Sequence, residues 1–366
     1  MVASLFGSGQ AQSPTATLEV VGALYLLLLY FAVRLTATPE RIDQFLDWYP
    51  ASVGCAALLG LAGVVAAAFG TQTPLASPIG ALLPYLGETA RAQALTPGPQ
   101  MLANLLLAAI PLAIARAHTC GWTPRRRGLV LLLSLGLLAT YSKTMLCLIV
   151  ALAVMAAILG RRRRIAVAVA VAVALIFLAM THLVVTKAVQ VAGLEGSQVV
   201  AGAPWASFSW RGDTWVVAPT TYVANNVVSL HAIRESWPVG LGPAQQAAYA
   251  ATLQRSGDYP ASIRFARFME PHSTYLGTVA ELGLAGVVAG LLLIAAGVLM
   301  LRRWVHSQPV DWTAAAVCGI FAGVLLEASA TDLMNCRHYW WLMAIVAVRA
   351  ARPAVVQGSV ARAPAL

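Results

Sequence analysis

Long apolar stretches recur along the chain, and they restrict its fold more than any other feature. A helix of about 20 apolar residues is long enough to cross the hydrocarbon layer of a bilayer. Nine candidate spans are present, of which the fourth and the last are short. They are Leu18–Ala32, Ala51–Gly70, Met101–Ala117, Gly128–Tyr141, Thr144–Gly160, Ile165–Val185, Tyr275–Met300, Trp312–Ala328 and Tyr339–Val348. The sequence therefore predicts an all-α, polytopic transmembrane helix bundle of about nine spans.

The composition excludes two other classes of protein. Hydrophobic residues make up 59% of the chain and charged residues 10%, whereas a soluble domain has about 25% charged residues. Disordered chains are polar and charged, so they are excluded as well. The stretch Ala166–Leu175 alternates small residues as a strand does, but its length and its basic flank predict a helix in lipid.

Basic residues predict the orientation in the membrane. Fifteen of the 24 Lys and Arg residues follow the odd-numbered spans, including Arg125–Arg127 and Arg161–Arg164. Three follow the even-numbered spans, and six lie in one long loop. Because cytoplasmic loops carry the excess of Lys and Arg, we expect the N-terminus outside and the C-terminus in the cytoplasm. The net charge of +10 then reflects topology, and we expect no nucleic-acid partner.

The same pattern divides the chain into three parts. Residues 1–185 hold N-terminal transmembrane helices with short loops, and residues 274–366 hold the C-terminal helices and a short cytoplasmic tail. Between them, residues 186–273 form one large outer loop with mixed polarity and four tryptophans. A loop of this length is uncommon unless it is functional or disordered. Its many aromatic and few charged residues predict a small, partly helical cap on the outer face.

The spans carry few ionisable groups, and these lie toward the span ends, among them Glu281 and Glu327 near the outer ends. Ion-coupled transporters need charges inside the membrane, so this pattern argues against one. The cysteines show neither a disulfide framework nor the spacing of a metal site. We therefore expect no metal and no cofactor, and we expect the chemistry to lie at the outer surface.

His272 is the candidate proton acceptor at that surface. It precedes a long apolar run that Ser273 or Thr274 would cap, which places it at the lipid–water boundary. A histidine can exchange a proton near neutral pH, because its ordinary pKa is about 6.5. The alternative is an interfacial or helix-capping residue.

Four arginines are candidates for binding anions. The planar guanidinium groups of Arg91 and Arg211 suit phosphate oxygens, although a surface carboxylate such as Asp213 is an alternative partner. Arg264 and Arg267 lie three residues apart beside two phenylalanines. That spacing favours an amphipathic helix on lipid headgroups, with substrate binding as the alternative.

Several of these residues resemble one family in their order along the chain. The run His272-Ser-Thr-Tyr-Leu, followed by Ala280-Glu-Leu-Gly, resembles a signature of the bacterial O-antigen ligase and polymerase superfamily. Upstream, Arg211 and Trp215 followed by Pro238-Val-Gly-Leu-Gly resemble the order in that family's large periplasmic loop. Arg91, Pro99 and the pair Ser142-Lys143 are similar to earlier family segments. This sequence has Gln100 and Ser273 where the family usually has Asn, and Lys143 where it often has Arg.

The resemblance implies a metal-independent glycosyltransferase in the bacterial inner membrane, with its active site facing the periplasm. The donor would be a glycan on undecaprenyl pyrophosphate, and the acceptor a sugar hydroxyl of lipid A–core or of a second lipid-linked glycan. His272 would act as general base, while Arg91 and Arg211 would hold the pyrophosphate. The further substrate-binding candidates are Tyr275, Trp215, Gly240, Gly242, Lys143, Arg264 and Arg267. For the two glycines a tight turn is the alternative role, and for Tyr275 and Trp215 it is anchoring at the interface.

Three functions remain open at this point. A ligase would move an assembled glycan onto lipid A–core, whereas a polymerase would join lipid-linked repeat units for O-antigen or exopolysaccharide. A membrane transporter is the third, and the scarcity of charges inside the spans disfavours it. We favour the ligase, because one large loop carries the Arg and His candidates together.

Overall fold

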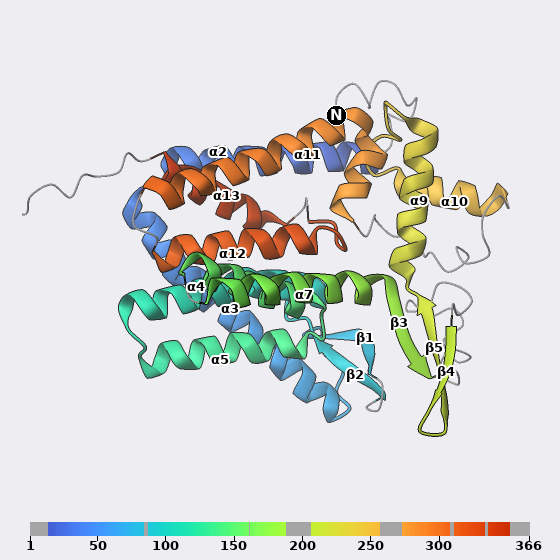
Figure 1. Cartoon of the computed structure of the whole chain (residues 1–366), viewed down its shortest axis with the longest axis horizontal. Coiled ribbons are helices and arrows are strands. Elements are labelled where there is room, and N and C mark those ends of the chain that lie inside the picture. Colours follow the sequence, from blue (N-terminus) through green and yellow to red (C-terminus); the bar gives the residue numbers. More distant parts are fainter. Residues whose placement is uncertain are drawn as a thin grey trace, which may run out of the picture.

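Most helices of the protein lie side by side in one bundle (Figure 1). In this computed structural model the described residues are 14–83, 87–160, 162–187, 206–256, 273–307, 311–333 and 336–351. The bundle is built from these helices: α2 (Pro14–Thr36), α3 (Pro39–Ala68), α4 (Pro99–Cys120), α5 (Pro124–Ala139), α6 (Thr144–Ile158), α7 (Arg163–His182), α11 (Thr274–Ser307), α12 (Trp312–Glu327) and α13 (Arg337–Ala350).

Local sequence explains where several of these helices begin. Pro39, Pro99 and Pro124 each stand in the first turn, where a missing N–H costs nothing. The hydroxyl of Thr123 accepts a hydrogen bond from the amide of Arg126 at 3.3 Å, and Asp311 caps α12 in the same way. Such caps satisfy amides that have no partner inside the helix.

Five of the described helices are long and apolar enough to cross a membrane by length and composition, namely α2, α3, α4, α7 and α11. Helices α6 and α12 are apolar but shorter. The protein is thus a mostly helical, multi-pass membrane protein, as predicted from the apolar stretches. The count of nine spans stays a prediction.

The stretch with alternating small residues is helical in the structure. Helix α7 covers Arg163–His182, which includes all of Ala166–Leu175. The predicted span continued to Val185, but the helix ends at His182 and strand β3 (Leu183–Lys187) follows directly. Its Val184, Val185 and Thr186 are β-branched, and such residues favour strands.

Two small antiparallel sheets lie beyond the predicted helices. Strands β1 (Ala76–Leu83) and β2 (Gly87–Ala92) pair in the segment between α3 and α4. In the large loop, β3, β4 (Ala206–Trp210) and β5 (Asp213–Pro219) pair in the order β3–β5–β4. Helices α9 (Thr221–Ser236) and α10 (Gln246–Ser256) complete the described part of this loop. Both sheets and α9 lie at the same end of the bundle (Figure 1).

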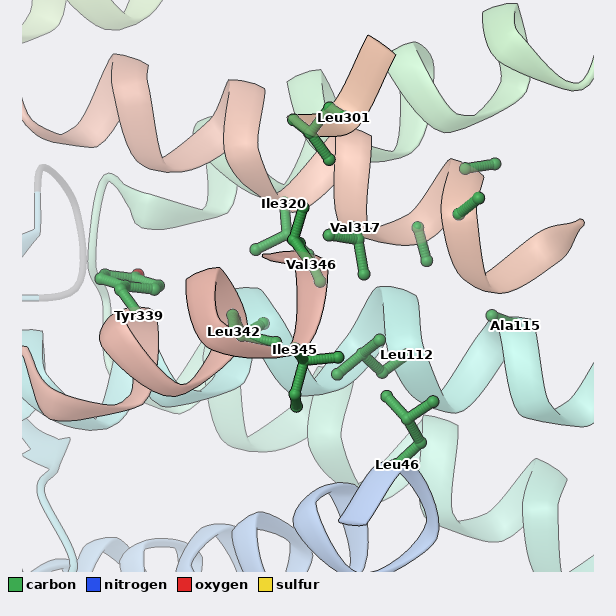
Figure 2. Packing of buried hydrophobic residues seen from close by; sticks show 14 of the residues in the cluster. Leu46, Leu112, Ala115, Leu301, Val317, Ile320, Tyr339, Leu342, Ile345 and Val346 are labelled. Carbon is green, nitrogen blue, oxygen red and sulfur yellow. The ribbon is translucent and has the colours of Figure 1, made fainter. Parts of the chain in front are cut away.

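The core of the bundle is formed by apolar side chains from five helices. Leu46, Leu112, Leu301, Ile320 and Ile345 belong to one buried cluster, drawn from α3, α4, α11, α12 and α13 (Figure 2). Because lipid is as apolar as these side chains, close packing rather than exclusion from water holds such helices together.

Small residues bring α6 and α12 into close contact. A Cβ atom on Gly319 would collide with the carbonyl oxygen of Ala151, and one on Gly323 would lie 2.8 Å from that of Cys147. Gly319 and Gly323 are four residues apart on one face of α12, as in other tightly packed membrane helices. Glu327 lies one further turn along this face. The close packing of the two helices places it next to Thr144, the first residue of α6.

Ion pairs join three helices at the opposite end of the bundle. Arg116 on α4 donates two hydrogen bonds to Asp47 on α3, at 2.7 and 2.6 Å. Arg349 on α13 lies 2.8 Å from Asp43, which is also on α3. Arg116 and Arg349 are among the basic residues from which the cytoplasmic side was predicted. In the structure they also connect α3, α4 and α13.

Candidate functional site

Arg91 lies where the first sheet meets the bundle. It stands in β2 opposite Ser77, and its Nε donates a hydrogen bond of 2.9 Å to the carbonyl oxygen of Thr140. Burial lowers the pKa of Arg91, and Tyr222 acts in the opposite direction. An arginine keeps its proton even so, because its ordinary pKa exceeds 12. A partly buried permanent cation therefore lies beside the connection between α5 and α6.

Lys143 belongs to that connection and approaches the same tyrosine. Its Nζ lies 4.6 Å from the centre of the Tyr222 ring, which stands at the start of α9. Burial lowers the pKa of Lys143 to about 8, although the carboxyl group of Glu327 acts against this shift. Burial also raises the pKa of the Tyr222 hydroxyl. Two cationic side chains from separate segments thus meet around one tyrosine.

A network of buried polar side chains lies next to these cations. Glu327 is 1% exposed, and its Oε1 accepts hydrogen bonds from Gln100 and, at 3.0 Å, from Thr144. The Ser142 hydroxyl donates to the Gln100 carbonyl oxygen at 2.7 Å. These bonds join the first turns of α4 and α6 to the last turn of α12. We call Arg91, Gln100, Ser142, Lys143, Thr144, Tyr222 and Glu327 the polar cluster.

Arg211 lies apart from the polar cluster in the described contacts. It forms the turn of the β4–β5 hairpin with a φ angle of +53°, and it is exposed. Its guanidinium group lies 4.8 Å from the centre of the Trp210 ring. Trp215 in β5 is 6% exposed, and its ring lies 5.7 Å from that of Trp210. The structure therefore brings Arg91 and Lys143 together, while Arg211 and Trp215 form a second, separate group.

The predicted glycines join the large loop to α11. The amides of Leu241 and Gly242 donate hydrogen bonds of 2.9 Å to the carbonyl oxygens of Ala280 and Glu281, and the amide of Leu284 donates to that of Pro238. Helix α11 is interrupted here, because Gly283 has a φ angle of +56° and a ψ angle of −135°. The amides of Gly240 and Gly242 are thus engaged within the chain, which supports the tight-turn interpretation of this motif.

The first turn of α11 is tied to the end of α12. Ser273 caps α11 as predicted, because its hydroxyl accepts a hydrogen bond from the amide of Leu276 at 3.3 Å. Thr274 donates from its hydroxyl to the carbonyl oxygen of Thr331 at 2.7 Å. Tyr275 donates to that of Leu325 at 2.6 Å and is 38% exposed. His272, Arg264 and Arg267 lie outside the described residues.

Only Arg91 and Lys143 of the polar cluster were predicted as site residues from the sequence. Gln100 and Ser142 were noted only for the family resemblance, and the roles of Thr144, Tyr222 and Glu327 were missed. Glu327 was visible as one of the few acids near the ends of apolar spans, and an ionisable residue in such a position is a functional-site candidate by default. Tyr222 gave no comparable signal. Within the described ranges, no group of three or more His, Cys, Asp or Glu side chains is placed to hold a metal ion.

The fold and the polar cluster describe a multi-pass membrane protein with cationic and polar side chains gathered at one end of its helical bundle. Residues 128–291 of this chain match a family model described as O-antigen ligase. The match begins in α5 and ends in α11. It therefore includes Lys143, Tyr222 and the contact of Gly240 and Gly242 with α11. The match supports the resemblance to the O-antigen ligase and polymerase superfamily that the sequence motifs indicated. Comparison with curated protein sequences gives no match.

Proposed function

We propose that the protein is a glycosyltransferase that moves a glycan from undecaprenyl pyrophosphate to a sugar hydroxyl of lipid A–core at the periplasmic face of the inner membrane. The family match supports an activity of the ligase or polymerase type. The observation that carries the proposal further is the convergence of Arg91 and Lys143 on Tyr222 beside the buried acid Glu327. Cationic side chains at a partly buried site suit a pyrophosphate leaving group.

In this proposal Arg91 and Lys143 hold the pyrophosphate oxygens. Hydrogen bonds to charged groups contribute about 1.5–3 kcal/mol each, and they strengthen as negative charge collects on the leaving group. Glu327 does not touch the substrate. It positions the cluster, because its carboxylate links Gln100 on α4 to Thr144 on α6. Arg211 would approach the glycan donor from the exposed hairpin.

His272 acts as the general base in the proposed reaction. It takes the proton of the acceptor hydroxyl while that oxygen attacks the anomeric carbon of the donor sugar. The bond between this carbon and the pyrophosphate oxygen breaks, and undecaprenyl pyrophosphate leaves with the electron pair. The hydrogen bonds of Thr274 and Tyr275 support this role, since they fix the residues after His272 to the end of α12, one turn from Glu327.

The roles of Arg91 and His272 are tested by transfer in proteoliposomes with a pyrophosphate-linked donor. We expect Arg91→Gln to lower kcat/KM about 10-fold or more, and His272→Ala to lower kcat about 10²–10⁴-fold. Arg125→Gln is the matched control, because Arg125 is exposed at the start of α5 and belongs to no described part of the site. Unchanged transfer by either site variant, with correct insertion and melting temperature, would refute the corresponding role.

Ligation and polymerisation are separated by the lipopolysaccharide of a strain that lacks the gene. A ligase predicts loss of all ladder bands together with accumulation of the lipid-linked polymer. A single band of core plus one repeat unit would instead assign the protein as a polymerase. Unchanged lipopolysaccharide would contradict a ligase and an O-antigen polymerase, and it would point to exopolysaccharide polymerisation or to transport.

A further inference from the structure

A groove of about 540 Å³ lies between α3, α4 and α13. Phe45, Tyr49 and Trp341 contribute aromatic rings to it, and Met101 and Leu105 contribute aliphatic side chains from α4. The Phe45 and Trp341 rings stack at 5.2 Å with 12° between their planes. The Tyr49 hydroxyl donates to the carbonyl oxygen of Leu105 at 3.1 Å, so its polar group is satisfied within the protein. This wall of the groove suits a hydrocarbon chain.

The other end of the groove is basic. Arg337 opens α13 and is exposed, and its guanidinium group lies 5.5 Å from the centre of the Tyr25 ring on α2. Among the described residues, Arg337 has no ion pair with a carboxylate. His338 also lines the groove, and its buried Nε2 has no hydrogen-bond partner in the described part of the chain. The other ring nitrogen of His338 hydrogen-bonds to the backbone of Asn104, so Nε2 of the neutral ring is an acceptor. A buried polar atom without a partner is costly, and this nitrogen therefore calls for a hydroxyl donor.

The beginning of α13 adds to this preference for an anion. Cys336 precedes the helix and provides no side-chain cap for its first amides. The N-terminal end of a helix carries a partial positive charge and attracts phosphate groups. The cation, the unpartnered His338 Nε2 and the uncapped helix start lie at consecutive residues. Together they suit a phosphate at Arg337, a headgroup hydroxyl at His338 and a hydrocarbon chain beside them.

The groove is separate from the polar cluster. Met101 and Leu105 are four residues apart and share the face of α4 that meets α3 and α13, whereas Gln100 bonds to Thr144 of α6 and Glu327 of α12. Helix α4 therefore lies between the two. A phosphate bound at Arg337 is not the group that reacts at the cluster, which favours a resident membrane lipid over the glycan donor.

We propose that this groove binds one anionic phospholipid of the surrounding bilayer, with its phosphate at Arg337, a hydroxyl of its headgroup at His338 and an acyl chain along Phe45 and Trp341. Basic pockets between transmembrane helices bind lipid headgroups by the same chemistry. The lipid joins α13 to α3 and α4, with its phosphate at the start of α13, the end of that helix opposite to Arg349. It thereby stabilises the position of α13.

Native mass spectrometry of the delipidated full-length protein tests this proposal, with phosphatidylglycerol and phosphatidylethanolamine added separately. We expect the wild type to retain one phosphatidylglycerol and to bind phosphatidylethanolamine at least 10-fold more weakly. Arg337→Gln should lower the affinity for phosphatidylglycerol about 10-fold. Met101→Trp should abolish binding while both basic residues remain, because the larger side chain fills the groove. Arg303→Gln is the control, since Arg303 is exposed on α11 and does not line the groove.

Three results would overturn the proposal. The first is retention of phosphatidylglycerol by both groove variants at the wild-type level, and the second is equal binding of the two phospholipids. The third is displacement of phosphatidylglycerol by equimolar undecaprenyl phosphate, which would assign the groove to the carrier lipid. The melting temperature measured with and without phosphatidylglycerol gives a second readout. The lipid should raise it in the wild type and in Arg303→Gln, but not in Met101→Trp.

Discussion

Lys143 is the member of the polar cluster whose charge changes within an accessible pH range. Burial lowers its pKa to about 8, so the ammonium group loses its proton as the pH rises through 8. If Lys143 holds pyrophosphate, kcat/KM for the donor should fall about 10-fold for each pH unit above that value. Lys143→Arg should remove this fall, because an arginine stays charged throughout. The measurement is the pH profile of transfer for both proteins between pH 6.5 and 9.5.

The contrast with Lys143→Gln completes this test. That variant carries no charge at any pH, so it should show a low kcat/KM and no inflection near 8. A wild-type profile that stays flat to pH 9.5, or a Lys143→Arg profile that still falls near 8, would show that another group titrates and that Lys143 does not carry the charge.

Among individual residues, the two cations of the polar cluster were easier to predict from the sequence than Glu327 and Tyr222. Arg91 and Lys143 were predicted from family-like order along the chain, and the structure brings both to Tyr222. Glu327 joins them because Gly319 and Gly323 let α12 pack closely on α6. That contact links residues 183 positions apart in sequence, Thr144 and Glu327, which no local pattern reveals. Tyr222 could not be predicted for the same reason, since its contact with Lys143 also joins segments that are distant in sequence.

At the scale of elements, the contact between the glycine turn and α11 fixes the large loop to the bundle. A Cβ atom on Gly283 would collide with the carbonyl oxygen of Pro238, and its φ and ψ angles suit glycine alone. We therefore expect Gly283→Ala to destabilise the protein by about 2 kcal/mol or more and to abolish transfer. Gly290→Ala is the matched control on α11, because no atom lies within 4 Å of its added Cβ.

Thermal unfolding in detergent and limited proteolysis of the large loop measure the effect of these two substitutions. Gly283→Ala should melt several degrees lower and expose the loop to protease, whereas Gly290→Ala should match the wild type. Equal melting temperatures for both variants would contradict a structural role of the Gly240–Gly283 contact.

The elements themselves were predictable where hydrophobicity and capping agree. Helix α7 follows from its apolar length, although its small residues alternate as in a strand. The sheets were not predicted, because β1 lies in an apolar segment between two helices that also suits the membrane interface. Strand β5 becomes recognisable only when β3 and β4 pair with it from both sides. Pairing between distant segments, rather than local preference, decides these strands.

At the scale of the whole molecule, the distribution of basic residues predicts which end of the bundle faces the periplasm. The polar cluster and both sheets lie at one end, and the ion pairs of Arg116 and Arg349 lie at the other. Two residues report on these ends. Cys120 is exposed at the end of α4, near Arg116, and Ser209 is exposed in β4.

Labelling of these positions with a membrane-impermeant maleimide in intact spheroplasts tests the orientation. In a Cys55→Ser background, Ser209→Cys should be labelled from outside, whereas Cys120 should be labelled only after the membrane is permeabilised. The remaining cysteines are fully or partly buried, so they contribute little signal. The reverse pattern would place the polar cluster on the cytoplasmic side. A lipid-linked glycan and its acceptor would then have to meet there, and the proposed periplasmic transfer would fail together with the predicted topology.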